Sequence, residues 1–369
     1  MDLQLSEEQE AFVATTRRFL AAECPIATTR ALEHDPDGFD RAVWRRGAEL
    51  GWTSLLVPEA HGGGSLSEHG LLDLVLVAEE VGRVVAPGPL VPVNVVAEAV
   101  GRLGSEAQRA AVLPGLLEGT EVAAWCGPRP VEARRRSDGR MELHGTCTPV
   151  EAAGAASHLL VTVRTPDGPA QVLVRTDRPG VAVTPLDGLD LVRRHARVDL
   201  DGAVVDDGAV LGTGDDLAGD LRHQEDLACA LQCAETVGAI DRVFAMTLEY
   251  LGDRWSFGRP LSSYQALKHR MADDKVWLEA CHAIATAAAR AVAVGASDAS
   301  EVVSAAKVWI GPHATEMVQD CIQLHGGIGV TWEHDLHLYL RRVTVDRASH
   351  GTPEEHAERI AARLLEGAA

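Results

Sequence analysis

The strongest constraint on the fold of this 369-residue chain is a residue pattern that changes twice. Up to about residue 120, apolar residues recur at helical spacing. From about residue 121 the chain becomes valine-rich and alternating, in segments such as "SHLLVTVRT", "AQVLVRTD", "GVAVTPL" and "HARVDLDGAVV", which is typical of β-strands. From about residue 218 the helical spacing returns. The chain must therefore place a β-region between two helical regions.

These changes predict three domains. We expect an N-terminal helical domain over residues 1–120, a small antiparallel β-sandwich or barrel over 121–215, and a C-terminal four-helix bundle over 216–369. The predicted fold class is mainly α with a central β-domain.

Two local signals mark helix starts in the first region. Ser6 and Gln9 form a capping-box pattern, and Ser105 and Gln108 repeat it. Because each pattern precedes an apolar-periodic run, both predict a helix that begins at the next residue.

Charge and cysteine content exclude several classes of protein. The formal net charge of -20 argues against partners such as nucleic acid or anionic membranes, which need basic patches. The acidic start "MDLQLSEEQE" does not resemble a signal peptide, and we find no apolar run long enough for a bilayer. Seven scattered cysteines predict buried free thiols in a cytoplasmic protein, and Cys229 and Cys233 lack nearby ligands for a metal site.

The segment "QLHGGIG" at residues 323–329 predicts unusually bare backbone. Phosphate-binding loops follow a strand and open a helix, whereas here the preceding stretch has helical spacing. One glycine at a helix end is a common cap. Three within four positions exceed that need, and this suggests that a ligand approaches the backbone closely.

Three stretches carry a family resemblance: "ELGWTSLLVPEAHGGG" (49–64), "DRWSFGRPLSSYQALKHRMAD" (253–273) and "CIQLHGGIGVTWEHDLHLYLRR" (321–342). With the order of its regions, the whole chain resembles the acyl-CoA dehydrogenase family. The resemblance implies a flavoprotein of lipid metabolism that holds FAD between β-domain and bundle and removes two hydrogens across the Cα–Cβ bond of an acyl-CoA substrate. It also implies a homo- or heterotetramer and electron-transfer flavoprotein, or a similar protein, as acceptor.

By the resemblance, the adenosine half of an FAD held mostly by a neighbouring subunit meets the last two stretches. Arg254 offers a planar, charged fork for the pyrophosphate, Ser256 can donate a hydroxyl to the same oxygens, and Phe257 offers an apolar face near the adenine. The residues assigned to FAD are Arg254, Ser256, Phe257, Gln265, Gln323, Gly326 and Gly327.

The stretches that correspond to the family's flavin-ring segments depart from its pattern. They are residues 123–140 and 143–153, in which Trp125 and Thr148 are the residues that can stack on the ring or hydrogen-bond to it. The run Arg134–Arg136 predicts a solvated loop, with contact to CoA phosphates as the alternative.

The catalytic base is the second departure. Many members of the family use the Glu of a Tyr-Glu-Gly-Thr segment to take the α-proton, and the matching stretch here is "SHGT", with His350 in that place. An unperturbed imidazole is largely neutral near pH 7, so His350 can itself be the base. A positioned base contributes ~10²–10⁴ in rate, so a chain without one is close to inactive alone.

Other relatives place a Glu on the first long bundle helix, where this chain has Ala228. Glu225 and Asp226 flank that position, and Glu235 lies two turns further along the same face. Glu235 is the strongest of these carboxylates because its helix neighbours are apolar or small.

A third interpretation is a division of labour. A chain that keeps the adenosine contacts and lacks the usual carboxylate matches the smaller, non-catalytic, FAD-sharing subunit of mixed α2β2 family members, several of which act on bulky acyl chains such as steroid side chains. The rival from another class is a structural or regulatory homologue that binds neither FAD nor substrate.

Overall fold

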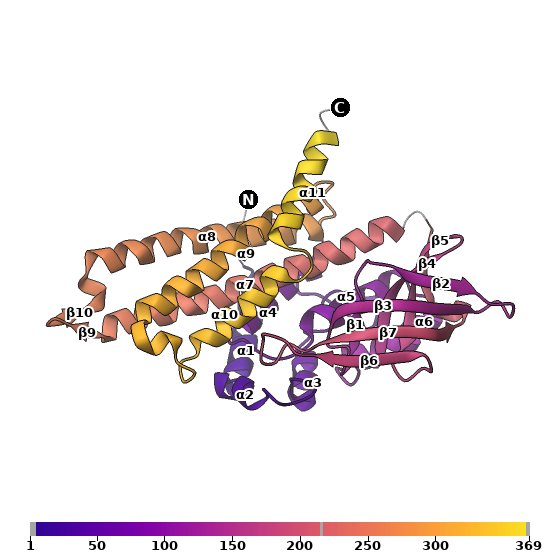
Figure 1. The fold of residues 1–369 in the computed structure, drawn as a ribbon, viewed down its shortest axis with the longest axis horizontal. Helices are drawn as coiled ribbons and strands as arrows, with labels where there is room; N and C mark the ends of the chain where they lie inside the picture. Colours follow the sequence, from indigo (N-terminus) through magenta and orange to yellow (C-terminus); the bar gives the residue numbers. More distant parts are fainter. Residues whose placement is uncertain (1–4, 215–216, 367–369) are drawn as a thin grey trace. The chain divides into compact units, whose positions relative to one another are not determined.

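The computed structural model describes residues 5–214 and 217–366 (Figure 1). Helices dominate both ends of the chain, and one eight-stranded sheet lies between them in the sequence. The predicted fold class, mainly α with a central β-domain, is therefore confirmed. In the part of the chain described, no helix is long and apolar enough to cross a membrane.

Contacts group the chain into two compact units that interleave along the sequence. The bundle unit contains the residues up to Thr29, Val75–Ala86 and the chain from Cys229 onward. The sheet unit contains Arg30–Leu74 and Pro87–Ala228. Division into sequential domains at residues 120 and 215 stays a prediction.

Long helices build the bundle unit, because apolar and small residues recur along them every three or four positions. Helix α9 packs against α8, α10 and α11. Helices α4 and α7 each begin in the sheet unit and continue into the bundle unit. The helices are α1 (Glu7–Glu23), α4 (Gly70–Arg83), α7 (Leu217–Asp253), α8 (Gln265–Ala293), α9 (Ala299–His325), α10 (Leu336–Ala348) and α11 (Pro353–Glu366).

Two glycines let α4 and α7 approach each other at backbone distance. A Cβ at Gly82 would lie 1.9 Å from the carbonyl oxygen of Glu235, and a Cβ at Gly238 would lie 1.9 Å from that of Glu79. No side chain fits at either position without moving a helix, so the crossing fixes Glu235 in the interior.

The sheet unit contains a mixed sheet in the order β6-β7-β3-β2-β4-β5-β8, with β1 paired to β4. Its strands are β1 (Ala123–Trp125), β2 (Val131–Arg135), β3 (Met141–Glu151), β4 (His158–Thr165), β5 (Gly168–Arg175), β6 (Val181–Leu186), β7 (His195–Val205) and β8 (Val210–Thr213). The helices of the first part of the chain are α2 (Ile26–Ala31), α3 (Arg41–Glu49), α5 (Leu90–Leu103) and α6 (Glu106–Leu117).

The four predicted strand segments form β4, β5, β6 and β7, but the purely antiparallel pairing was wrong. Strand β4 pairs in parallel with both β1 and β2. The cause is the hairpin of β2 and β3: β3 occupies one side of β2, so β4 pairs on the other side and runs in the direction of β2.

The run Arg134–Arg136 was predicted to be a loop, but most of it belongs to a strand. Arg134 and Arg135 lie at the end of strand β2, and only Arg136 enters the turn that follows. All three side chains are exposed. Salt bridges to Asp207 and Glu142 hold Arg135 and Arg136, at 3.7 and 3.1 Å respectively.

Both predicted capping boxes are confirmed. The Ser6 and Ser105 side chains accept hydrogen bonds from the backbone of Gln9 and Gln108, whose side chains bond back to the cap. The seven cysteines are free, and all except the half-buried Cys126 are buried, as expected.

Candidate functional site

A two-residue hairpin follows α7 and presents an aromatic side chain to solvent. Strands β9 (Trp255–Ser256) and β10 (Arg259–Pro260) pair antiparallel, and Phe257 and Gly258 turn the chain with φ of 51° and 78°. Positive φ at both central positions is the type I′ geometry, which favours Asn and Gly and strains a bulky residue. Phe257 is nevertheless 97% exposed. Neither the turn geometry nor packing among the described residues accounts for a Phe there.

The glycine segment lies at a helix end, as predicted. Helix α9 ends at His325, and Gly326 turns the chain with φ 64° into a short 3₁₀ segment, Gly326–Val330. A Cβ at Gly329 would lie 2.4 Å from the carbonyl oxygen of Ile322, so packing inside the chain requires that glycine. A Cβ at Gly327 would meet nothing within 4 Å, and its φ is not left-handed. Its lack of a side chain has no cause within the described residues.

These two segments meet at one end of the bundle unit. The Tyr250 hydroxyl, near the end of α7, donates to the carbonyl oxygen of His325 at 3.1 Å, and the two rings stack with centroids 4.3 Å apart. Figure 1 shows the hairpin and the start of α10 at the same end of the long helices. We call residues 254–265 and 323–330 the bundle tip.

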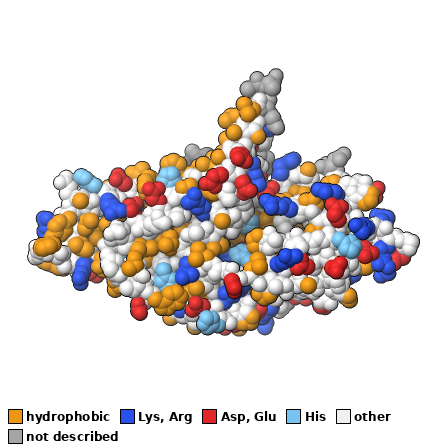
Figure 2. Space-filling model, viewed as in Figure 1, with side chains coloured by type: hydrophobic (Ala, Val, Ile, Leu, Met, Phe, Trp, Pro, Cys, Tyr) orange, Lys and Arg blue, Asp and Glu red, His pale blue; other side chains and the backbone are white. Residues whose placement is uncertain are grey.

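The polar side chains of the bundle tip are available to a ligand. Arg254, Gln265 and Gln323 are exposed, and none has a side-chain hydrogen bond or ion pair to another residue in the described ranges. Ser256 is half-buried, and its carbonyl oxygen accepts a hydrogen bond from the Tyr264 hydroxyl at 2.8 Å. Figure 2 shows hydrophobic side chains gathered at this end of the molecule.

His350 lies in a strained turn between α10 and α11. Its φ is 55°, and its carbonyl oxygen accepts hydrogen bonds from the Cys229 thiol at 3.4 Å and the His356 ring at 3.0 Å. The His356 ring also bonds to Ser304 at 3.0 Å, and burial lowers the pKa of His356 to about 4. The backbone of the turn is therefore held from α7 and from α11.

Glu235 lies in the interior at the crossing of α4 and α7. Only 1% of it is exposed, and its carboxylate accepts a hydrogen bond from Arg342 at 2.5 Å. Arg342, also 1% exposed, donates in addition to the carbonyl oxygen of Ala86 at 3.4 Å. For Glu235 to take a proton from a substrate, this ion pair would have to open.

Further buried polar side chains lie on the helices that carry this pair, α7 and α10, and on α9. The Lys307 ammonium donates to the Gln232 side chain at 2.6 Å and to the carbonyl oxygens of Asp346 and Ser349 at 2.5 and 2.7 Å. It thereby satisfies backbone carbonyls at the C-terminal end of α10, where a cation is favourable. We call Gln232, Glu235, Thr236, Lys307, Arg342 and Asp346 the buried polar network.

Sequence reasoning missed Lys307 and Arg342. Lys307 interrupts "VVSAAKVWIG", whose other residues are apolar or small, so the reasoning that selected Glu235 also applies to it. Arg342 gave no such signal, because it follows Arg341 in a run that resembles a solvated helix face.

Within the bundle unit, the predicted residues form two separate groups. The bundle tip begins next to Asp253, and Glu235 lies eighteen residues earlier in α7, which is about 27 Å along a helix axis. His350 belongs with Glu235, since its carbonyl bonds to Cys229 on the same helix.

The carboxylates near Ala228 and the flavin-ring candidates lie in the sheet unit. Trp125 is 7% exposed, and its indole nitrogen donates to Gln224 at 3.1 Å, whereas Thr148 is exposed. Glu225 and Asp226 are half-buried. Among the residues described, no cluster of three or more His, Cys, Asp or Glu side chains could hold a metal ion.

Comparison with known families gives matches at both ends of the chain. The description "Acyl-CoA dehydrogenase, N-terminal domain" matches residues 6–120, and "Acyl-CoA dehydrogenase, C-terminal domain" matches residues 227–365. The chain is 30% identical to acyl-CoA dehydrogenase FadE27 of Mycobacterium tuberculosis, and the match covers 99% of both chains.

Two solved structures are similar over nearly their whole length. The first, a variant of the Tcur3481-Tcur3483 steroid ACAD, has 29% identity and a TM-score of 0.87, and the match covers 98% of this chain and 99% of that one. The second, the ChsE4-ChsE5 complex of Mycobacterium tuberculosis, has 27% identity and a TM-score of 0.89, with 99% of each chain covered.

Proposed function

Because the chain belongs to the acyl-CoA dehydrogenase family, we propose that it is a FAD-dependent enzyme that introduces an α,β double bond into an acyl-CoA thioester. The observation that carries the proposal is the bundle tip. There, the side chains of Arg254, Gln265 and Gln323, which the family resemblance assigns to FAD, are exposed and have no partner among the described residues, and the strained Phe257 is almost fully exposed.

The residues of the bundle tip fit the adenosine half of FAD. The Arg254 guanidinium can bind two phosphate oxygens at once, and its side chain is not occupied by a carboxylate of the described chain. Gly327 leaves its backbone open to close approach, and Phe257 offers a flat apolar surface suited to an adenine ring.

The position of the bundle tip supports an assembly. The bundle tip begins just after the end of α7, about 27 Å along that helix from Glu235, so the two groups of one chain do not form one compact site. We therefore propose that each FAD is shared between subunits, in a homo-oligomer or with a related acyl-CoA dehydrogenase subunit.

When bound, FAD supplies the two-electron acceptor, and electron-transfer flavoprotein or a similar protein is the proposed onward acceptor. His350 is the better candidate for the base that takes the α-proton. Hydrogen bonds to its carbonyl oxygen fix its backbone, which limits where the imidazole can move. Glu235 is the alternative base, and it requires loss of its contact with Arg342.

A non-catalytic, FAD-sharing subunit is the second candidate. The ion pair between Glu235 and Arg342 favours this candidate. With Glu235 engaged there, the chain has His350 in the place where the family usually has a free carboxylate. Both similar structures are named as pairs of proteins, and one is named a steroid enzyme. A bulky acyl chain is the substrate class that this candidate suggests.

The flavin spectrum of the purified chain tests these candidates. Saturating flavin absorbance supports the self-sufficient enzyme, and uptake of FAD only with a related subunit supports the shared assembly. Arg254→Met should weaken FAD binding at least ~10-fold, because a charge-assisted bidentate contact is lost. If neither the wild type alone nor its mixture with a related subunit takes up FAD, the proposed function is wrong.

The base is tested by turnover with a series of acyl-CoA thioesters and an artificial electron acceptor. His350→Ala should lower kcat at least ~100-fold with flavin content unchanged, and Glu235→Gln gives the matched test of the carboxylate. If neither substitution lowers the rate, both catalytic assignments are wrong.

A further inference from the structure

The three tyrosines of the chain use their hydroxyl groups in the same way. Each hydroxyl donates a hydrogen bond to a backbone carbonyl oxygen of the bundle unit. The pairs are Tyr250 with His325 at 3.1 Å, Tyr264 with Ser256 at 2.8 Å and Tyr339 with Arg83 at 2.8 Å. The first two acceptors lie in the bundle tip, whereas the third is the last residue of α4. Tyr339 is therefore a matched comparison for the other two tyrosines.

Tyr250 joins the two segments of the bundle tip. It lies one helical turn before Arg254, whose backbone N–H donates to the Tyr250 carbonyl oxygen at 2.9 Å. The Tyr250 hydroxyl reaches the carbonyl oxygen of His325, the residue directly before Gly326 and Gly327. One residue thereby holds the backbone that carries the proposed pyrophosphate ligand close to the backbone that is open to the adenosine.

The ring of His325 is packed on more than one side. It is 3% exposed, it stacks on the Tyr250 ring, and the His334 ring meets it edge-on with centroids 4.8 Å apart. The Nδ1 atom of His325 lies 2.8 Å from the carbonyl oxygen of Cys321, which can only accept, so this nitrogen carries the hydrogen. A Phe at position 250 would keep the ring stacking. The hydrogen bond to the His325 carbonyl is the contact that requires the Tyr250 hydroxyl.

Tyr264 supports the hairpin of β9 and β10. Its hydroxyl donates to the carbonyl oxygen of Ser256 in β9, and the Arg259 guanidinium of β10 lies over its ring, 3.8 Å from the centroid. The backbone N–H of Leu261 also donates to the carbonyl oxygen of Arg254 at 2.8 Å. A two-stranded hairpin is marginally stable by itself. These contacts therefore determine where the turn of the hairpin lies.

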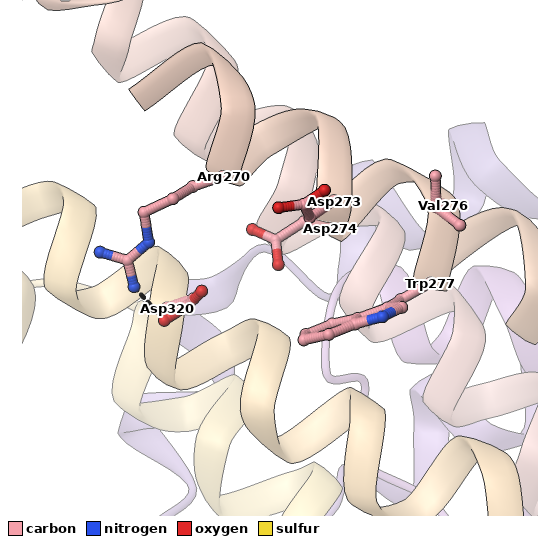
Figure 3. Close-up of a pocket in the computed structure, with 6 residues that line it drawn as sticks. All are labelled: Arg270, Asp273, Asp274, Val276, Trp277 and Asp320. Carbon is pink, nitrogen blue, oxygen red and sulfur yellow. Dashed lines mark hydrogen bonds and ion pairs between the residues drawn. The ribbon is translucent and has the colours of Figure 1, made fainter. Parts of the chain in front are cut away.

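The helices that adjoin the bundle tip are tied together without either tyrosine. Arg270, near the start of α8, forms an ion pair with Asp320, near the end of α9, in a cleft between these two helices (Figure 3). Gln265 of the bundle tip lies just before Arg270 in the sequence, and Gln323 lies just after Asp320. Loss of a tyrosine hydroxyl should therefore change the backbone of the tip while α8 and α9 stay in place.

We propose that Tyr250 and Tyr264 are positioning residues for the adenosine half of FAD. Tyr250 sets the spacing between Arg254 and the glycine segment. Tyr264 sets the orientation of the hairpin that presents Ser256 and Phe257. Each hydroxyl donates its hydrogen to a carbonyl oxygen, so its effect passes through the backbone and not through a direct contact with the cofactor. This inference rests on the proposed binding of FAD at the bundle tip.

The first test removes each hydroxyl separately. Flavin titration of the full chain, with a related subunit present if the chain alone takes up no FAD, measures the dissociation constant of FAD. Tyr250→Phe and Tyr264→Phe should each raise it ~3–10-fold, because each removes one hydrogen bond that orders the tip. Tyr339→Phe removes an equivalent hydrogen bond elsewhere in the bundle unit and should leave the dissociation constant unchanged. Circular dichroism and thermal unfolding of all three variants show whether each is folded and how much stability it loses.

A purely structural role gives a different result. The His325 carbonyl lies at the end of α9, where helical carbonyls lack an intrahelical partner, so the Tyr250 hydroxyl also stabilises that helix end. If this is its whole role, Tyr250→Phe lowers the melting temperature as Tyr339→Phe does and binds FAD like the wild type. A tyrosine whose Phe variant gives that result is not a positioning residue, and the proposal is wrong if both do.

The second test is a double-mutant cycle in FAD binding. In the Arg254→Met background, Tyr250→Phe should raise the dissociation constant by a smaller factor than in the wild type, because the spacing that Tyr250 sets then positions one contact fewer. Equal factors in the two backgrounds overturn the assignment of Tyr250. Failure of the proposed function is recognised separately: the wild type then takes up no FAD with or without a related subunit, and this inference is wrong with it. Failure of the inference alone leaves FAD uptake and the effect of Arg254→Met intact.

Discussion

The bundle tip and the buried polar network differ in the environment of their charged and aromatic side chains. In the network, charged groups lie in the interior and are matched by partners of the same chain: Glu235 by Arg342, and Lys307 by three oxygens. At the tip, Phe257 and Arg254 face solvent without such partners in the described chain. The first arrangement is explained by folding alone. The second has no explanation among the described residues, so exposure and the lack of a partner distinguish the proposed binding residues from structural ones better than residue type does.

The largest effect expected is on the network. Arg342→Met should lower the free energy of unfolding by about 3–5 kcal/mol, because it removes the guanidinium that pairs with the buried Glu235 carboxylate. Urea unfolding monitored by circular dichroism measures this loss. The double variant Glu235→Leu/Arg342→Met should recover most of it, and a double variant as unstable as the single one would show that the pair is not an isolated unit.

The next effect depends on pH. The pKa of His356 is lowered to about 4 by burial, whereas an unfolded His takes up a proton near pH 6.5. Its contribution to stability is therefore present above pH 6.5 and is lost as the pH falls to 4, by about 3 kcal/mol in total. The difference between wild type and His356→Gln, measured by urea unfolding at several pH values, should change over that window. A constant difference from pH 7 to pH 4 would contradict the assignment.

A pair of glycines gives a matched comparison within the bundle tip. Gly329→Ala should destabilise the fold by about 1–3 kcal/mol, since its Cβ would lie 2.4 Å from the oxygen of Ile322. Gly327→Ala meets open space and should leave the melting temperature almost unchanged while weakening FAD binding. Thermal unfolding and flavin titration of both variants separate the two roles. Equal FAD affinity in Gly327→Ala and wild type would remove this glycine from the proposed site.

The smallest effect expected is a gain in stability. Phe257→Asn should stabilise the chain by about 1 kcal/mol, because Asn tolerates the left-handed conformation that strains Phe. The same substitution should weaken FAD binding, measured by flavin titration. A loss of stability instead would mean that the Phe ring packs on the chain in solution.

Much of the fold can be predicted from local sequence pattern. The rest cannot, because it depends on contacts between residues far apart in the sequence. Helix α9 and the glycine turn after it follow from spacing and from residues within a few positions of one another. The parallel pairing of β4 depends on which side of β2 remains open, a choice that no single segment encodes. Glu235 could be singled out, but its partner Arg342 lies 107 residues away, and only packing reveals that a candidate base is half of an ion pair.

The hairpin at the bundle tip affects how the isolated chain behaves. Phe257 has an unfavourable backbone conformation, and its ring is almost wholly exposed to water. The isolated subunit is therefore strained at this turn and presents an apolar surface to other chains. Newly made chains would then be prone to aggregation until a partner covers that ring, which in the proposed assembly is FAD with a neighbouring subunit. In that proposed assembly, the supply of FAD would determine how much folded protein accumulates, as well as its activity.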